Sequence, residues 1–307
     1  MKILFFGTTE FSCSMLSSII SAGHEIAGVV TLPDKPVSRG HKAVPTAVKK
    51  LAMEKDLLLF LPDNLKDESF AAELKNLNAD IGVVVSFKIL PRRVFTAPRL
   101  GTLNVHPSLL PKLRGPAPVR WALIEGCEET GVTTFLLDDK VDTGEIILSR
   151  SIPVGFDENY EELFSKVIPV ASEVLLESLE SVGSGHYKSF KQDSLLATKA
   201  PKLNTEICRI NWNKSAYMLH NLIRGLSPTP GAWTELNEQR YKILKALPIE
   251  KSGKPGEIIE CDAKTALVVA CGKGALKILK IQAPGKKAMD CGSFLCGCKL
   301  KLGEVFA

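Results

Sequence analysis

Apolar residues in the first part of the chain follow two alternating spacings. Short, nearly continuous apolar runs such as residues 81–85 are typical of strands buried on both faces of a sheet. Between these runs, apolar residues recur every three or four positions, which is typical of amphipathic helices. The predicted strands are residues 2–6, 25–32, 57–60, 81–85, 102–105, 131–137 and 145–152, and the predicted helices are 10–22, 45–54, 66–77, 118–125 and 159–181. This alternation predicts an α/β domain with a Rossmann-like parallel sheet and helices on both faces.

The pattern changes after residue 182. Residues 183–203 lose periodicity and gather Gly, Ser, Lys and Pro, which is typical of a linker. A short helix at 216–224 follows, and then brief β-rich runs at 240–244, 256–261, 266–271 and 276–282 are separated by turn residues. Short strands at this spacing predict a small antiparallel, OB-like β-barrel. We therefore predict domains at 1–182 and 204–307, joined by a linker at 183–203.

Composition and charge agree with two folded domains. The chain has 307 residues, and about 150 residues per domain is usual. Apolar residues make up 45% and charged residues 24%, which excludes disordered and collagenous proteins. The net charge is +5, but residues 1–203 carry −2 and residues 204–307 carry +7. The basic C-terminal region favours a polyanionic partner such as a nucleic acid.

Targeting signals are not evident in this sequence. The longest strongly apolar stretches, at 3–6 and 81–87, are far shorter than the roughly 18 residues that a membrane span requires. The first thirty residues have neither a signal-peptide core nor the bias of a transit peptide. We therefore expect a cytoplasmic protein without membrane contact, whose eight cysteines are reduced.

The turn after the first predicted strand tests a dinucleotide-binding interpretation. It reads Gly7-Thr-Thr-Glu10, without the second and third glycines of the dinucleotide fingerprint. An acidic residue at a helix start suits the helix dipole but repels a pyrophosphate. Nucleotide-cofactor binding is therefore disfavoured.

A polar pair ends the predicted strand at 102–105. Side chains alternate along a strand, so Asn104 and His106 project from one face and Val105 from the other. In an open α/β sheet, ligands bind just beyond the carboxyl ends of the strands. A hydrogen-bonded Asn with a structural His is an equally good interpretation of this pair taken alone.

A second loop adds an acidic candidate. Within residues 138–144, Asp138 and Asp139 are typical of a solvated turn, whereas Asp142 could face His106. A carboxylate beside an imidazole raises the histidine pKa and fixes the orientation of the ring, and Asn104 would donate a hydrogen bond to a developing oxyanion. Asn, His and Asp without a nucleophilic Ser or Cys favour direct acyl transfer between two bound substrates.

Two other residue groups have plainer interpretations. Cys291, Cys296 and Cys298 are closely spaced, but they lack a complete four-ligand zinc pattern and a nearby His, so we interpret them as reduced structural thiols and predict no metal. The three tryptophans are interpreted as core residues rather than ligand platforms: Trp121, Trp212 and Trp233.

These motifs together resemble a known family. Asn-Val-His-Pro-Ser-Leu-Leu-Pro at 104–111, followed by Asp-Thr-Gly at 142–144, resembles the folate-dependent formyltransferase superfamily. Within it, the chain is most similar to the branch that formylates methionyl-tRNA, over essentially its full length. Further ordered matches lie at 6–11, 33–40, 114–118, 130–133, 200–202, 221–224, 230–233 and 283–289.

The resemblance implies a reaction and a set of residues. Asn104, His106 and Asp142 would be catalytic, 10-formyltetrahydrofolate the formyl donor, and the α-amino group of initiator methionyl-tRNA the acceptor. The domain at 1–182 would be the formyltransferase domain, the basic domain at 204–307 would bind tRNA, and the protein would be a monomer. The implied folate-binding residues are Phe87, Leu90, Ser108, Leu109, Leu110 and Pro111, and the implied tRNA-binding residues are Lys35, Arg39 and Lys42.

Alternatives and departures from the family pattern remain. A glycinamide-ribonucleotide or sugar-nucleotide acceptor is a second possibility, and a non-catalytic RNA-binding module is a third. The complete set of Asn104, His106 and Asp142 favours an enzyme. Residues 85–91 are one residue shorter than is usual in the family, and Thr229 replaces a common Trp.

Overall fold

The computed structural model describes residues 1–34, 44–262, 266–297 and 300–307. The chain forms two compact units. The first comprises residues 1–116, 131–152 and 166–200, and the second comprises residues 117–130, 153–165 and 201–307. The domain boundaries drawn from the sequence stay a prediction. Within the described residues, no helix is both long and apolar enough to cross a bilayer.

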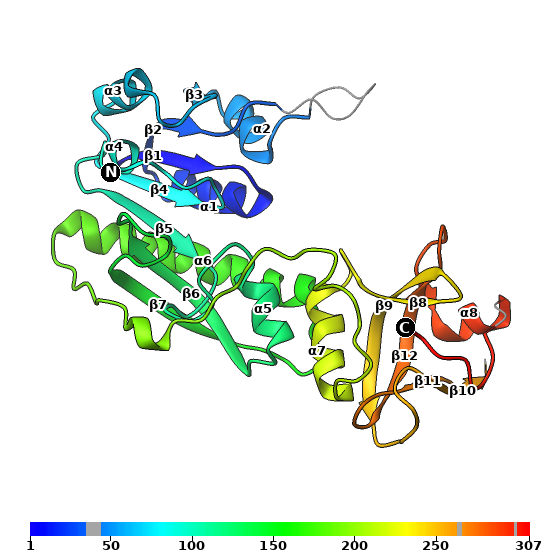
Figure 1. Ribbon diagram of the computed structural model, residues 1–307. Helices are drawn as coiled ribbons and strands as arrows, with labels where there is room; N and C mark the ends of the chain where they lie inside the picture. The colour runs from blue at the N-terminus through cyan, green and yellow to red at the C-terminus, as the bar shows by residue number, and fades with distance from the viewer. Residues whose placement is uncertain (35–43, 263–265, 298–299) are drawn as a thin grey trace. The chain divides into compact units, whose positions relative to one another are not determined.

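A seven-stranded sheet organises the first unit (Figure 1). The strand order is β3-β2-β1-β4-β5-β6-β7, and all pairs from β3 to β5 are parallel. The pair β5–β6 is antiparallel, so the sheet is mixed rather than wholly parallel. The strands are β1 Lys2–Gly7, β2 Glu25–Val30, β3 Leu59–Phe60, β4 Ile81–Val85, β5 Thr102–His106, β6 Glu129–Leu136 and β7 Ile146–Pro153.

Helices cover both faces of this sheet. On one face, Ser18 of α1 donates a hydrogen bond to Ser172 of α6 at 3.0 Å, and Ser178 of α6 lies 2.6 Å from the Thr134 hydroxyl of β6. On the other face, apolar residues of α3 and α4 join the buried cluster that contains Phe6 of β1. The predicted Rossmann-like layering is therefore confirmed. The helices are α1 Glu10–Ser21, α2 Ala47–Glu54, α3 Glu68–Asn76, α4 Arg92–Phe95 and α6 Tyr160–Ser184.

The turn after β1 is tight and tied to the end of β4. A Cβ at Gly7 would lie 2.6 Å from the Cβ of Ser12, so the close approach of strand and helix requires glycine. The hydroxyl of Ser12 donates to the carbonyl of Val85 at 2.7 Å, and that of Thr8 donates to Ser86 at 2.8 Å. These bonds fix the carboxyl edge of the sheet, where the chain leaves β4.

The second unit contains an antiparallel sheet. Its strand order is β10-β11-β12-β9-β8, with β13 beside β12. The predicted run of short antiparallel strands is confirmed, and the described pairs form one open path, so closure into a barrel stays a prediction. The elements are α5 Pro118–Ile124, α7 Ala216–Leu226, β8 Ala232–Leu236, β9 Gln239–Ile249, β10 Ile258–Asp262, β11 Ala266–Ala270, β12 Ala275–Gln282, β13 Met289–Asp290 and α8 Cys291–Gly297.

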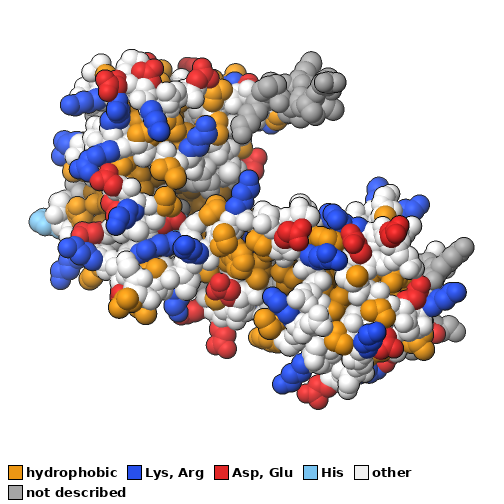
Figure 2. All heavy atoms as spheres, in the orientation of Figure 1, with side chains coloured by type: hydrophobic (Ala, Val, Ile, Leu, Met, Phe, Trp, Pro, Cys, Tyr) orange, Lys and Arg blue, Asp and Glu red, His pale blue; other side chains and the backbone are white. Residues whose placement is uncertain are grey.

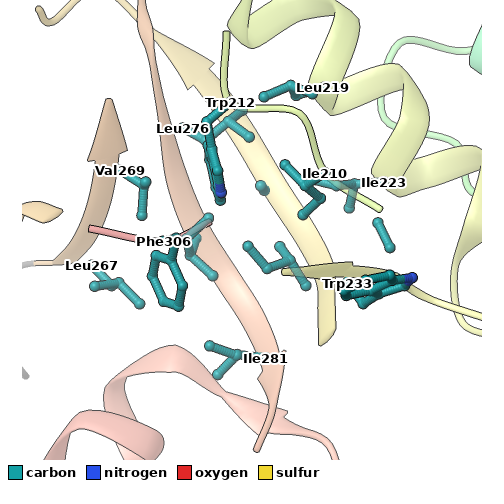
Figure 3. Packing of buried hydrophobic residues seen from close by; sticks show 14 of the residues in the cluster. Ile210, Trp212, Leu219, Ile223, Trp233, Leu267, Val269, Leu276, Ile281 and Phe306 are labelled. Atoms are coloured by element: carbon teal, nitrogen blue, oxygen red, sulfur yellow. The ribbon is translucent and has the colours of Figure 1, made fainter. Parts of the chain in front are cut away.

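Aliphatic side chains surround a few aromatic rings in the core of the second unit (Figure 3). Trp212 stacks on Phe306 with the ring centroids 6.0 Å apart, and its indole N–H donates to the Thr234 hydroxyl at 2.9 Å. Trp233 is 6% exposed, and its indole N–H donates to the carbonyl of Thr205. Both tryptophans are core residues, as predicted. Trp121 is only half-buried and donates to the carbonyl of Pro201.

Buried polar side chains of α7 hold the chain that precedes α6. Arg224 is 7% exposed, and its Nη1 donates to the carbonyl of Gly155 at 2.8 Å while its Nε donates to Asn221 at 2.8 Å. His220 lies within 3.0 Å of the carbonyl oxygen of Phe156. Buried polar side chains require hydrogen-bond partners, and the carbonyls of Gly155 and Phe156 supply them here. These contacts therefore hold residues 155–158 against α7.

Candidate active site

The two polar residues of β5 lie where the sheet changes from parallel to antiparallel pairing. Asn104 is opposite Val84 of β4 on one side and Phe135 of β6 on the other. His106 is opposite Thr133 of β6 and lies two residues beyond the last residue paired with β4. Asn104 is half-buried and His106 is 5% exposed. The strand thus carries both side chains on one face at its carboxyl end, as predicted.

The imidazole of His106 has a defined tautomer. Its Nε2 lies 3.0 Å from the carbonyl oxygen of Leu113. A carbonyl oxygen can only accept, so Nε2 carries the proton and the neutral ring has its lone pair on Nδ1. The bond is made by a loop residue in a left-handed conformation, since Leu113 has φ 61°.

Burial, rather than the nearby carboxylate, dominates the pKa of His106. Burial lowers the pKa of His106 below its usual value, and this effect outweighs the raising effects of the Asp142 charge and of the Leu113 carbonyl. Asp142 acts in the expected direction, but burial is the larger effect. A buried, neutral imidazole is able to accept a proton.

Asp142 faces inward and its two acidic neighbours do not. Its Oδ2 accepts a hydrogen bond from the backbone N–H of Gly115 at 2.8 Å, and its charge acts on His106. Asp138 instead caps its own turn through the hydroxyl of Thr143, and Asp139 forms an exposed ion pair with Arg92. The structure thus brings Asp142 together with His106 and leaves Asp138 and Asp139 on the surface.

The loop after β5 is held by β6. Ser108 is fully buried, and its hydroxyl donates to the carbonyl of Lys112 at 2.8 Å. The Thr133 hydroxyl donates to the carbonyl of Ser108 at 2.7 Å and accepts from the N–H of Leu110 at 3.2 Å. These bonds give the loop a fixed path from His106 to its partner Leu113.

The implied folate residues lie on two loops at one edge of the sheet. The loop after β4 carries Phe87, half-buried with its ring 6.0 Å from Phe6, and Leu90, which is 6% exposed. The loop after β5 carries the others: Ser108 and Leu110 are buried, and Leu109 and Pro111 are half-buried. Because β4 and β5 are adjacent and parallel, both loops leave the same edge.

The implied tRNA residues Lys35, Arg39 and Lys42 lie outside the described residues. The same holds for Cys298. Across the ranges that the structure describes, no group of three or more His, Cys, Asp and Glu side chains is arranged to hold a metal ion.

The backbone groups of Leu113 and Gly115 were missed by the sequence analysis. They are the hydrogen-bond partners of His106 and Asp142. Backbone atoms are present in every residue, so residue type alone does not reveal such a role. The only signal was the run Arg114-Gly-Pro-Ala-Pro118, which the family resemblance already included.

The lowered pKa of His106 predicts how stability depends on pH. Between that lowered value and about 6.5, the unfolded chain binds a proton that the folded chain does not, so stability falls as the pH falls. The contribution is at most about 1.4 kcal/mol per pH unit. His24, whose pKa is also lowered by burial, adds in the same direction.

Urea unfolding between pH 5 and 8 tests this contribution. The free energy of unfolding should depend less steeply on pH for His106→Gln than for wild type. Equal slopes would contradict the buried neutral imidazole.

Comparison with known protein families places these residues in context. Residues 1–179 match the family model described as formyl transferase, and residues 202–299 match the model described as formyl transferase, C-terminal domain. The chain belongs to the formyl transferase family. The resemblance derived from the sequence motifs is thereby confirmed.

Close relatives cover nearly the whole formyltransferase. A methionyl-tRNA formyltransferase from Citrifermentans bemidjiense is 38% identical over 306 residues, covering 99% of this chain and 96% of that protein. A methionyl-tRNA formyltransferase from Porphyromonas gingivalis is 41% identical over 313 residues, covering 98% of this chain and 96% of that protein.

Solved structures share the fold at lower identity. HypX from Aquifex aeolicus in complex with tetrahydrofolic acid is 22% identical, with a TM-score of 0.62, covering 96% of this chain and 46% of HypX. An N-formyltransferase from Helicobacter canadensis in complex with folinic acid and dTDP-3-aminofucose is 18% identical, with a TM-score of 0.68, covering 92% and 99% of the two chains. At such identities the likeness establishes the fold alone.

Proposed function

We propose that this chain transfers the formyl group of 10-formyltetrahydrofolate to the α-amino group of initiator methionyl-tRNA, giving N-formylmethionyl-tRNA for translation initiation. Relatives named for this activity match almost the entire chain. The observation that carries the proposal is the geometry at the end of β5, where a neutral His106 lies beside Asp142 and two positions beyond Asn104. A proton acceptor, a carboxylate and an amide donor are the groups that formyl transfer to an amine needs.

The mechanism that follows uses three side chains. The neutral amine attacks the formyl carbon, a C–N bond forms, and the carbonyl electron pair moves to oxygen. The Asn104 amide donates to this oxyanion, and Nδ1 of His106 accepts the proton that the attacking nitrogen loses. The resulting imidazolium is stabilised by Asp142. Collapse of the intermediate breaks the bond to N10 of the folate, which takes the proton from His106 and leaves as tetrahydrofolate.

The two loops at the sheet edge would hold the folate. Phe87 and Leu90 would contact the donor from the loop after β4, and Leu109, Leu110 and Pro111 from the loop after β5. Ser108 would act by shaping its loop, since its hydroxyl is bound to the Lys112 carbonyl.

The decisive experiment is transfer of labelled formyl from 10-formyltetrahydrofolate to charged initiator tRNA. Glycinamide ribonucleotide and an amino-sugar nucleotide are offered as competing acceptors in the same assay. Label in methionyl-tRNA is the expected result. Label only in the ribonucleotide or the amino-sugar nucleotide would show that this compound, and not methionyl-tRNA, is the acceptor. No transfer to any acceptor would support a non-catalytic RNA-binding module.

The basic C-terminal part would bind the tRNA through phosphates, on an OB-like barrel. On the face seen in Figure 2, Lys and Arg side chains are interspersed with Asp and Glu. The net charge of +7 over residues 204–307 nevertheless attracts a polyanion, so tRNA binding should weaken steeply as salt is raised. A cytoplasmic location and a monomeric state complete the proposal.

Arg39 offers a test of the tRNA-binding loop. With Lys35 and Lys42, it lies in a basic stretch that would reach the acceptor end of the tRNA. A hydrogen bond to a charged group typically contributes about 1.5–3 kcal/mol, so Arg39→Ala should lower kcat/KM for methionyl-tRNA by about tenfold or more. The KM for the folate should not change. Unchanged kinetics on charged tRNA would show that this stretch does not contribute to tRNA binding.

A further inference from the structure

The segment predicted to be a linker contacts both loops of the candidate site. Helix α6 ends at Ser184, and the backbone groups of Phe190 then exchange two hydrogen bonds of 2.9 Å with Ile146. Lys199 forms a parallel bridge with Arg114. Residues 190–200 therefore run along the first unit between two loops that are far apart in sequence.

Gln192 joins these two loops through its side chain. Its Nε2 donates to the carbonyls of Asp142 at 3.0 Å and Gly144 at 2.8 Å. Its Oε1 accepts from Nε and Nη2 of Arg114 at 3.1 and 2.6 Å. A carboxamide has two N–H donors and two acceptor lone pairs, so all four hydrogen-bonding positions are used.

The loop at 113–115 is also fixed by the backbone beyond Gln192. The N–H of Leu113 donates to the Thr198 hydroxyl at 2.9 Å, and that of Arg114 donates to the Thr198 carbonyl at 2.9 Å. Gly115 has φ 124°, and a Cβ there would lie 2.6 Å from the carbonyl oxygen of Ala200. The loop that carries the partners of His106 and Asp142 is therefore packed against this segment.

Both loops are held in conformations that need external support. Leu113 and Asp142 have φ of 61° and 55°, in the left-handed region that costs non-glycine residues about 1–3 kcal/mol each. The Leu113 carbonyl sets the tautomer of His106, and the Asp142 carboxylate acts on its charge. A small displacement of either loop would therefore disturb the groups that move the proton.

We propose that Gln192 is a positioning residue for formyl transfer: its carboxamide ties the loop at 142–144 to Arg114 and so holds the Asp142 carboxylate in register with His106. This role rests on the proposed function. Gln192 bonds to Arg114 and to the backbone of Asp142 and Gly144, so it would act through Asp142. Displacement by about 1 Å can lower a rate by about 100-fold.

The test compares Gln192→Leu and Gln192→Glu with Ser194→Ala, an exposed position in the same segment. Leu keeps a similar size without hydrogen bonds, and Glu keeps the contact with Arg114 but turns a carboxylate oxygen toward the Asp142 and Gly144 carbonyls. Both should lower kcat about 10- to 100-fold and change KM for either substrate less than threefold. Ser194→Ala should equal wild type. A Gln192→Leu enzyme within twofold of wild type would overturn the proposal.

A double-mutant cycle separates positioning from general stabilisation. If Gln192 acts through Asp142, Gln192→Leu should have less than a threefold effect in the Asp142→Asn background. Equal losses in both backgrounds would overturn the proposal.

Hydrogen exchange of the Gly115 amide supplies a readout that does not depend on activity. That N–H is bound to Asp142, so its exchange should be at least about tenfold faster in Gln192→Leu and unchanged in Ser194→Ala. Unchanged exchange would overturn the proposal. If the wild-type protein formylates no methionyl-tRNA, the proposed function is overturned instead. The exchange result would still show whether Gln192 holds the loop at 142–144 in place.

Discussion

Asn104→Ala should lower the turnover number about 100-fold and leave the KM for 10-formyltetrahydrofolate unchanged. Asn104 lies at the carboxyl end of β5, two residues before His106, and its amide would donate to the oxyanion that forms in the transition state. An interaction made only in the transition state affects kcat rather than ground-state binding. Loss of one oxyanion donor typically costs about 3 kcal/mol, which corresponds to this factor.

Single-turnover kinetics with labelled donor and charged tRNA would measure the effect. Asn104→Asp should be at least as damaging, since it replaces a donor with a negative charge that repels the oxyanion. Asn76→Ala is a matched control, because Asn76 is exposed at the last residue of α3. Normal turnover by Asn104→Ala would remove this residue from the mechanism.

The sequence predicted the strands that carry the site because their pattern is local. Residues 81–85 form β4 as predicted, and the alternation of Asn104, Val105 and His106 correctly placed two polar side chains on one face of β5. The antiparallel pairing of β5 with β6 is a tertiary choice that side-chain periodicity does not encode. Short elements were also missed: α4 is four residues long, and α8 is seven.

The protonation state of His106 shows why a site is harder to predict than a strand. The nearby carboxylate could be inferred from the motif, and its effect on the pKa has the predicted sign. The larger effect is burial, which depends on tertiary packing around the ring and was not visible in the sequence. Gln192 escaped notice for a related reason, since it lies in a stretch without periodicity and contacts residues about fifty and eighty positions away.

The burial of His106 changes the role of the acidic loop. Burial lowers the pKa of His106 in the free protein, which favours the neutral ring that accepts a proton from the attacking amine. The imidazolium then exists only during the reaction, when the charge of Asp142 stabilises it most. The carboxylate therefore stabilises the transition state more than the resting site. Such a difference raises kcat.

The substitution Asp142→Asn should also have a large effect and lower kcat by about 100- to 10,000-fold. The substitution changes charge with little change in shape. An Asn carbonyl can still accept from the Gly115 N–H, and Asn tolerates the left-handed backbone of this position, where φ is 55°. Because Asp142 raises the pKa of His106, removing its charge should lower that pKa further and weaken the ring as a proton acceptor.

Asp139→Asn is the matched control for this variant. It lies in the same loop and makes an exposed ion pair with Arg92, an interaction typically worth at most about 1 kcal/mol, so its turnover should match wild type. Both variants should unfold within a few degrees of wild type, and the KM for charged tRNA should be similar. Turnover by Asp142→Asn within tenfold of wild type would mean that His106 accepts the proton without the carboxylate, and the electrostatic step of the mechanism would have to be abandoned.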